Sequence, residues 1–222
     1  MGWRVTSSGS LAAIAVTLAV AGCGGNMRQD AGEPSGKFPV RVTAARFPTA
    51  QTLSQHTHLV IAVRNSGSKT IPNLAVTICN ISCSATSQPG SGSGSGAQAF
   101  AENLDQADLA NPSRPVWIVD TPPGHCEYSC AQGGPGGAVT AYANTWALGP
   151  LRPGDTAKFD WGVTAVKPGR HVVSYVVAAG LNDKARAVTN RGSSPQGSFK
   201  VKISNAPAQA YVKNQGGIVS SH

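Results

Sequence analysis

Beyond residue 37 the hydrophobic residues of this chain recur with a period of two, which is the pattern of half-buried β-strands. Successive side chains of a strand point to opposite faces, so an alternating strand buries one face and exposes the other. More uniformly apolar stretches at 116–119 and 171–179 are typical of central strands, and 142–148 is a weaker candidate. The alternating apolar positions are Phe38, Val40 and Val42; Leu59, Ile61 and Val63; Leu74, Val76 and Ile78; Ala157, Phe159, Trp161 and Val163; and Phe199, Val201 and Ile203.

Turn residues separate these candidate strands. Asn65-Ser66-Gly67, Pro153-Gly154 and Pro168-Gly169 all break the apolar pattern with residues that favour tight turns. The only helical hint is the spacing of Phe100, Leu104 and Leu109, which predicts one weak turn or two. We therefore predict an all-β fold, an antiparallel two-sheet β-sandwich of about seven to eight strands, rather than an α/β fold.

A short apolar segment at the start of the chain ends in a cysteine. Arg4 supplies a weak positive charge, and Leu11 to Val20 gives about ten apolar or small residues, the length of a signal-peptide core and too short to span a bilayer. The run Leu18-Ala19-Val20-Ala21-Gly22-Cys23 resembles the lipobox of bacterial lipoprotein signal peptides. The resemblance implies removal of residues 1–22 and acylation of Cys23 with diacylglycerol and acyl chains such as palmitate, which places the protein on the outer face of the cell membrane. An ordinary secretory leader is the alternative.

The rest of the chain divides by composition. Residues 23–37 are rich in Gly, Pro and charge, so we expect a lipidated, disordered tether that reaches roughly 45 to 50 Å when extended. Residues 38–204 form the predicted sandwich, and residues 205–222 form a C-terminal tail. Two long insertions, 80–114 and 121–141, interrupt the strand pattern and are expected to be loops.

Two segments of the predicted sandwich carry a family resemblance. One is Val63-Arg64-Asn65-Ser66-Gly67 followed by residues 71–76, and the other is residues 148–154 followed by Phe159-Asp160-Trp161 and Tyr175. They resemble CARDB-type (cell-adhesion-related) domains and related prokaryotic Ig-like surface domains, in which an Asn-Gly arch joins two strands and a Pro-Gly turn opens the next. The resemblance implies an Ig-like fold over residues 38–204, and a fold does not identify a ligand.

With Cys23 assigned to lipid, four of the five cysteines remain, and all four border or lie in the insertions. Cys79 and Cys83, like Cys126 and Cys130, are four positions apart and lie where the strand pattern stops. Disulfides persist outside the cytoplasm, and residues four apart can be bridged across a turn but not along a strand. Local pairs, Cys79 with Cys83 and Cys126 with Cys130, are therefore favoured. Pairing that staples the two loops together is the rival, and a zinc site that includes His125 is a third possibility.

Other chemistry is poorly supported by the sequence. His56 and His58 point to one face of a strand, where a metal ion could bridge them, but a solvated polar face is the simpler interpretation and we predict no metal site. The Gly92-Ser93-Gly94-Ser95-Gly96 match to a hydrolase elbow lies in a Gly/Ser repeat, which is typical of a linker. Acidic residues do not alternate in pairs on any patterned strand. We therefore predict no catalytic residue and no cofactor, and we expect that the protein is not an enzyme.

The net charge of +8 is concentrated in the second half, where ten lysines and arginines from Arg152 onward face three aspartates. Such an excess attracts anionic headgroups or acidic cell-wall polymers, although a plain solubilising surface has the same composition. Nucleic acid is not an expected partner, because aromatic residues do not interleave with the basic ones. The sequence favours a membrane-anchored Ig-like module that binds a protein or an anionic envelope polymer. The alternative is a metal-binding or redox lipoprotein that uses the loop cysteines.

Overall fold

The computed structural model describes residues 1–2, 30, 32–83, 99–102, 115–124, 138–139, 144–207, 210–212 and 218–220. None of these residues lies in a helix long and apolar enough to span a bilayer. The elements are β1 (Gly36–Arg46), β2 (Ala50–Leu53), β3 (His56–Asn65), β4 (Ala75–Asn80), β5 (Phe100–Glu102), β6 (Trp117–Thr121), β7 (Ala138–Val139), β8 (Thr145–Ala147), β9 (Thr156–Ala165), β10 (Gly169–Ala178), β11 (Ala185–Val188), β12 (Gln196–Pro207), β13 (Ala210–Val212) and β14 (Ile218–Ser220).

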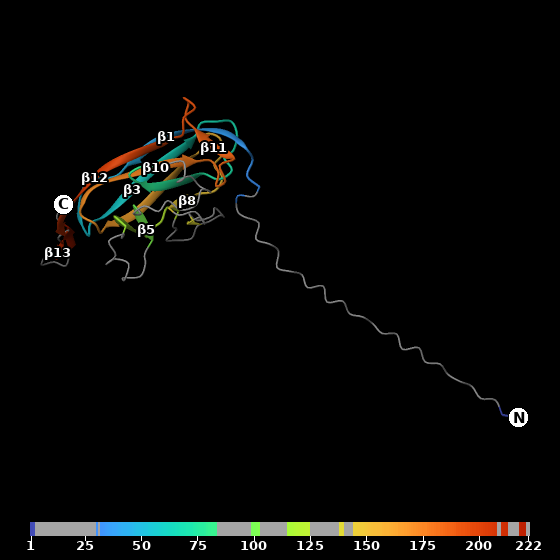
Figure 1. The fold of residues 1–222 in the computed structure, drawn as a ribbon, viewed down its shortest axis with the longest axis horizontal. Helices are drawn as coiled ribbons and strands as arrows, with labels where there is room; N and C mark the ends of the chain where they lie inside the picture. The colour runs from blue at the N-terminus through green and yellow to red at the C-terminus, as the bar shows by residue number, and fades with distance from the viewer. Residues whose placement is uncertain are drawn as a thin grey trace.

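The strands form two six-stranded sheets that pack against each other (Figure 1). The first sheet has the order β11-β1-β3-β9-β6-β5, and the second has the order β2-β12-β10-β4-β8-β7. The short strands β13 and β14 pair with each other in a separate antiparallel ribbon. The all-β, two-sheet sandwich predicted from the alternating pattern is therefore confirmed, and the two sheets together have twelve strands where the pattern indicated about seven to eight.

The inner strands follow the connectivity of an immunoglobulin domain. Strands β1, β3, β9 and β6 lie in the order A-B-E-D of such a domain, and β12, β10 and β4 lie in the order G-F-C. All neighbours within these two groups pair antiparallel. Strand β8 pairs with β4 as the extra strand of a variable-type domain does, although here it follows β6 along the chain. The sandwich is Ig-like in its core.

Three pairs at the sheet edges are parallel, which corrects the expectation of a purely antiparallel sandwich. Strand β11 pairs in parallel with β1, β2 with β12, and β5 with β6. Each of these edge strands has three or four residues. So few residues cannot establish a period of two, and such strands form because the longer neighbour offers unpaired backbone groups.

The core is built around aromatic side chains from both sheets. Trp117, Trp146, Trp161, Phe100 and Phe159 are all fully buried. The Trp161 ring of the first sheet meets the Trp146 ring of the second edge to face, with 5.5 Å between ring centroids, and lies 5.6 Å from Phe159. Aromatic pairs at such separations stabilise by about 0.5–1.5 kcal/mol beyond the burial of their surface. The contact between Trp161 and Trp146 therefore ties the two sheets together.

Strands also occur in segments that the sequence assigned to loops and to the tail. Phe100, expected in a weak helical turn, lies in strand β5 and packs against Trp117 at 5.9 Å between ring centroids. The insertion 80–114 therefore contains a strand, and the insertion 121–141 contains β7. Strand β12 runs on to Pro207, and β13 and β14 lie in the predicted tail.

Within the described residues, contacts with the sandwich begin before Phe38: the side-chain amide of Asn182 donates to the Asp30 carbonyl at 2.6 Å. The Glu33 carboxylate accepts hydrogen bonds from the backbone amide of Leu181 at 2.8 and 2.9 Å and from that of Asn182 at 3.3 Å. Strand β1 begins at Gly36, whose amide donates to the carbonyl of Lys184 at 2.9 Å. Partial burial raises the pKa of Glu33, although the two backbone hydrogen bonds act in the opposite direction. Asp30, Glu33 and Gly36, which composition assigned to the tether, thus contact the sandwich.

Asn65 joins the two segments on which the family resemblance rests. It is only 1% exposed at the end of β3, and its side-chain amide donates to the carbonyls of Lys69 at 2.8 Å and Leu151 at 2.9 Å. Its side-chain oxygen accepts from the amide of Gly67 at 3.0 Å. The backbone groups of Ile71 and Leu151 also bond to each other. The residues of this motif therefore hold one end of the sandwich together.

Candidate functional site

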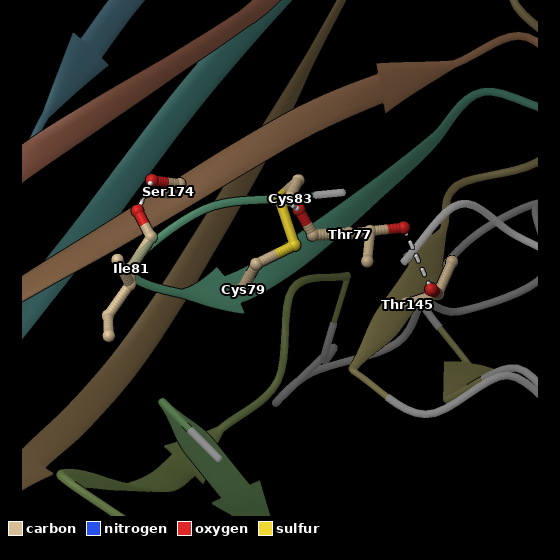
Figure 2. Close-up of a disulfide and its surroundings, with 6 residues drawn as sticks. All are labelled: Thr77, Cys79, Ile81, Cys83, Thr145 and Ser174. Atoms are coloured by element: carbon tan, nitrogen blue, oxygen red, sulfur yellow. Dashed lines mark hydrogen bonds between the residues drawn. A yellow bond between two sulfur atoms is a disulfide. The ribbon is translucent and has the colours of Figure 1, made fainter. Parts of the chain in front are cut away.

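Cys79 and Cys83 form a disulfide across a short loop, as the favoured local pairing predicted (Figure 2). Their Cα atoms are 5.2 Å apart because the chain reverses at Ile81, which has a φ of 67°. The reversal is held by the amide of Ile81, which donates to Val172, and by the hydroxyl of Ser174, which donates to the Ile81 carbonyl at 2.7 Å. Oxidised sulfurs are not thiolate ligands, so a four-thiolate zinc site is not formed.

The remaining residues that the sequence identified for lipidation or loop chemistry come from the leader and from the insertion 121–141. Cys23, Cys126, Cys130 and His125 lie outside the described residues. The lipid anchor at Cys23 and the pairing of Cys126 with Cys130 therefore remain predictions from the sequence.

A groove on the sandwich is lined by β1, β10, β11 and the loop between β11 and β12, and at one end by the last residues of β3 and the turn that follows them. It consists of three adjoining hollows of about 410, 540 and 380 Å³, the first two sharing Ser194 and the last two sharing Arg41 and Asn190. We call these hollows together the basic groove. The described charged residues that line it are Lys37, Arg41, Arg64, Arg186 and Arg191, with Asp183 as the single carboxylate among them.

The register of the sheet brings two of these arginines together. Arg41 of β1 lies directly opposite Arg64 of β3 in the antiparallel pair, and both side chains are exposed. Like charges directly opposite each other on neighbouring strands are destabilising. Within the described part of the chain, neither arginine forms an ion pair with a carboxylate. Solvent or an anionic ligand must therefore screen the repulsion between the two guanidinium groups.

Arg191 reaches the groove from a tight turn. The amide of Gly192 donates to the Thr189 carbonyl at 2.9 Å, and the amide of Thr189 donates to the Ser193 carbonyl at 2.8 Å. Gly192 has a φ of 80°, a left-handed conformation that glycine adopts without a steric penalty. The turn fixes the backbone at Arg191 while its side chain stays exposed. A third guanidinium is thereby presented beside Arg41.

Asp183, the single carboxylate among the described residues that line the groove, neutralises little of the positive charge of its lysine and arginines. Partial burial raises the pKa of Asp183, and the neighbouring Arg186 acts in the opposite direction. The side chain of Arg186 is also held locally, because its Nε donates to the Asp183 carbonyl at 3.2 Å. Asp183 thus faces Arg186, and it leaves Arg41, Arg64 and Arg191 without a carboxylate partner among the described residues.

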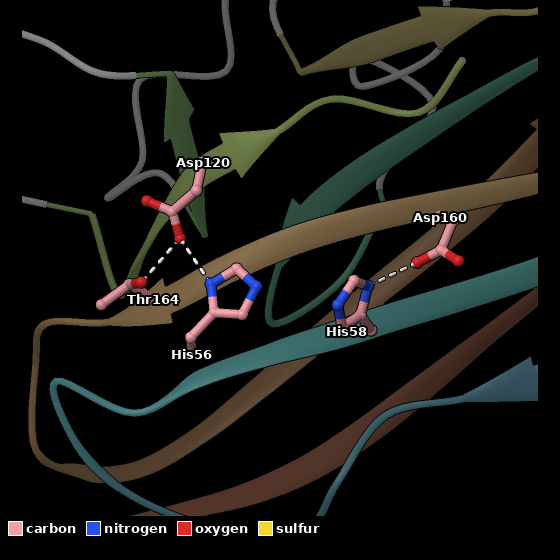
Figure 3. A network of polar contacts seen from close by, with 5 residues as sticks. All are labelled: His56, His58, Asp120, Asp160 and Thr164. Atoms are coloured by element: carbon pink, nitrogen blue, oxygen red, sulfur yellow. Dashed lines mark hydrogen bonds and ion pairs between the residues drawn. The ribbon is translucent and has the colours of Figure 1, made fainter. Parts of the chain in front are cut away.

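A second polar cluster covers the outer face of β3, β9 and β6 (Figure 3). His56 Nδ1 lies 3.0 Å from Asp120 Oδ2, and the Thr164 hydroxyl donates to the same oxygen at 2.6 Å. His58 Nδ1 lies 2.8 Å from Asp160 Oδ1. All of these side chains are partly or largely exposed. The structure therefore gives each histidine of β3 its own aspartate partner. Asp160 comes from the neighbouring strand β9, and Asp120 comes from β6, one strand beyond β9.

Asp160 is the most strongly engaged carboxylate of this cluster. Its second oxygen accepts from Lys158 Nζ at 2.6 Å, while the first faces His58. Partial burial raises the pKa of Asp160, but the hydrogen bonds from Lys158 and His58 outweigh it, so the pKa is lowered from its ordinary value. Asp160 is therefore held in its ionised, hydrogen-bond-accepting form.

Sequence reasoning identified the two histidines on one face of a strand but not their carboxylate partners. Asp120 and Asp160 lie 64 and 102 positions from the histidines that they contact. Only the register between β3 and β9 and between β9 and β6 brings them together. The basic groove was also missed, because its arginines come from four separate segments. The excess of basic residues after Arg152 was a partial signal for it.

No protein-family model matches the chain, and no curated protein matches it. Solved structures with a partly similar arrangement include native alpha-2-macroglobulin from Escherichia coli, spanning domain MG7 to the C-terminus, with a TM-score of 0.40 and 14% identity. Another is a CARDB domain from Pyrococcus furiosus in complex with di-metal ions, with a TM-score of 0.37 and 9% identity. A third is the human F-spondin reeler domain, with a TM-score of 0.34 and 9% identity.

The extent of these similarities differs between the three structures. The aligned region covers 78% of this chain but only 18% of the alpha-2-macroglobulin fragment. It covers 77% of this chain and 93% of the CARDB domain, and 81% of this chain and 100% of the reeler domain. Because all three TM-scores are below 0.5, no activity, ligand or partner of these proteins is transferred to this chain.

Proposed function

We propose that this chain is a lipid-anchored module on the outer face of the cell membrane that binds an anionic polymer of the cell envelope in the basic groove and has no catalytic activity. The observation that carries the proposal is the pair Arg41 and Arg64, which face each other across two strands without a carboxylate partner among the described residues. A polymer with phosphate or carboxylate groups relieves their repulsion, because planar guanidinium groups bind such anions through two parallel hydrogen bonds.

The shape of the groove suits an extended ligand rather than a small one. The second hollow shares lining residues with both the first and the third, and positively charged side chains occur in all three. A polyanion that follows the groove meets Arg186 and Lys37 in the first hollow, Arg191 in the second and Arg64 in the third. The first hollow includes Lys37, which lies next to Gly36 at the start of β1, so this end of the groove is close to the N-terminal end of the sandwich. With a lipid on Cys23, this end of the domain is the one closest to the membrane.

Binding to a defined polymer tests the groove. The triple variant Arg41→Gln, Arg64→Gln, Arg191→Gln is compared with Arg46→Gln, Arg170→Gln, Lys200→Gln, which removes the same charge from exposed positions outside the groove. Poly(glycerol phosphate) and polygalacturonate serve as probes, and neutral dextran as the control polymer.

We expect the groove variant to bind at least about threefold more weakly than the wild type, since each exposed ion pair contributes about 0.2–1 kcal/mol. The matched variant should bind nearly as well as the wild type, and binding by the wild type should weaken as salt increases. Equal losses in both triple variants would show attraction by net charge alone, and the groove would then not be the binding site.

The anchor has its own test. Intact mass of the wild type purified from membranes should show acyl chains on Cys23, and the Cys23→Ala variant should move to the soluble fraction, because two acyl chains give stable attachment. A Cys23→Ala variant that stays in the membrane, together with a wild type that carries no acyl mass, would overturn the anchor. This result would leave the polymer-binding experiment unaffected.

A further inference from the structure

We propose that His56 and His58 form a binding site for a divalent late-transition metal ion, such as Zn²⁺ or Cu²⁺, on the outer face of β3. The site is separate from the basic groove. It rests on four observations: the tautomer imposed on each ring, the distance between the rings, the space left above Gly162, and the carboxylates behind both histidines.

The hydrogen bonds determine which nitrogen of each ring is free. Nδ1 of His56 faces Asp120, and Nδ1 of His58 faces Asp160. An ionised carboxylate only accepts hydrogen bonds, so in a neutral histidine the proton must lie on Nδ1 and the lone pair on Nε2. Both rings are thereby set in the same tautomer, with Nε2 available to bind a metal.

The two rings stand at a distance that suits a shared metal ion. Their centroids are 5.3 Å apart. With Zn–N bonds of about 2.0–2.1 Å and tetrahedral angles, two imidazoles on one ion have centroids roughly 5.2 Å apart. In Figure 3 the Nε2 side of each ring faces the other histidine, while the Nδ1 sides face the two aspartates. Positions two apart on a strand share a face, which is why both rings can reach one ion.

Gly162 leaves room for the ring of His56. It lies opposite His58 in the register of β3 and β9, and a β-carbon at this position would stand 3.1 Å from Cε1 of His56. A glycine inside a strand often marks a place where another group must approach closely. The side chains of His56 and His58 are 51% and 58% exposed, so water can complete the coordination of a bound ion.

The aspartates supply the support that metal-binding histidines usually have. Ligand histidines donate their second ring N–H to a carboxylate or carbonyl, which orients the ring and raises its basicity. Both aspartates are themselves held, Asp120 by the hydroxyl of Thr164 and Asp160 by Lys158. Within the described ranges no group of three or more His, Cys, Asp or Glu residues is placed to hold a metal. The site therefore offers two protein ligands, and imidazole pairs of this kind favour Cu²⁺, Ni²⁺ and Zn²⁺ over Mg²⁺ or Ca²⁺.

Titration of the full chain, purified in detergent, with Zn²⁺ and separately with Cu²⁺ tests the site. The variants His56→Gln and His58→Gln should each weaken binding at least tenfold. The Cu²⁺ complex of the wild type should show two coordinated nitrogens by electron paramagnetic resonance. The matched control is His171→Gln, because Nε2 of His171 already lies 3.0 Å from the Lys167 carbonyl and should contribute nothing.

Asp120→Asn separates a positioning role from a general structural one. We expect it to weaken Zn²⁺ binding by about 10- to 100-fold while the Cu²⁺ spectrum still shows two nitrogens. The proposal is overturned if the wild type binds neither ion at millimolar concentration. It is also overturned if binding persists unchanged in the double variant His56→Gln, His58→Gln, since the ion would then bind elsewhere in the chain.

Discussion

Replacing Asn65 by alanine tests whether the motif between β3 and the 151 loop stabilises the fold. The substitution removes three hydrogen bonds of 2.8 to 3.0 Å from a side chain that is 1% exposed. The Leu151 carbonyl keeps a second donor, the amide of Ile71 at 2.9 Å, whereas the Lys69 carbonyl and the Gly67 amide lose the Asn65 side chain as their partner.

At about 0.5–1.5 kcal/mol for each hydrogen bond, the expected loss is about 2–4 kcal/mol of unfolding free energy. For a domain of this size this corresponds to a decrease in Tm of about 4 to 16 °C. Asn65→Asp should cost more than Asn65→Ala at pH 7, because it directs a carboxylate at two carbonyl oxygens. Urea unfolding followed by tryptophan fluorescence measures both losses, and the exposed neighbour Ser66→Ala, expected within about 0.5 kcal/mol of the wild type, is the control.

A loss below about 1 kcal/mol for Asn65→Ala would refute this reasoning, because water would then replace the side chain at little cost. Equal stability of the Asp and Ala variants at pH 7 would also contradict it. In that case the donors of Asn65 would not be the groups that matter, and backbone pairing between the two loops would be sufficient to hold this end of the sandwich.

Three further substitutions probe other parts of the molecule. Gly197→Ala places a β-carbon 2.6 Å from Tyr175 Oη and should cost about 1–3 kcal/mol, a loss that Tyr175→Ala should largely abolish in a double-mutant cycle. Replacing Cys79 and Cys83 together by serine opens a five-residue ring and should lower the unfolding free energy by about 2 kcal/mol, measured in urea without reductant; unchanged stability would contradict a stabilising disulfide. Because the pKa of Asp160 is lowered from 3.8, its contribution to stability is complete above pH 3.8 and is lost as the pH falls through the folded-state pKa. Asp160→Asn should therefore be less stable than the wild type at pH 7 and equal to it at the acid end of the titration. A difference in stability that does not depend on pH would show that the carboxylate charge is not responsible.

The long strands were predictable from the sequence, whereas the short ones were not. Strands β3 and β9 are ten residues long each, which gives enough positions with a period of two to detect a buried face. In β4 the alternation predicted one exposed face, but the side chains of that face, Ala75, Thr77 and Cys79, are buried as well. Strands such as β2 and β11 depend on a longer neighbour that the sequence does not identify.

The candidate sites show the same division between local and long-range information. The spacing of His56 and His58 correctly predicted that they share one face of a strand. The turn residues around Cys79 and Cys83 correctly predicted the disulfide between them. The partner of His56 depends on a register between strands that local sequence does not contain. The same holds for Arg41 and Arg64, whose juxtaposition follows from pairing between β1 and β3. The contact of Glu33 with the sandwich was not predicted, because it depends on one side chain, whereas the tether was assigned from the composition of the whole segment 23–37.

The short strands at the sheet borders have a consequence for how copies of this protein behave at high local concentration. Proteins displayed at high density risk joining through free strand edges, and short or charged edge strands oppose such aggregation. The outermost strands β11, β5, β2 and β7 have only two to four residues each. Beyond Pro39, β1 pairs with β3 but not with β11. This part of β1 bears Arg41 and Arg46, and its pairing with β3 has a register shift between Val42 and Ala44. We therefore expect crowded copies to remain separate molecules rather than to polymerise edge to edge.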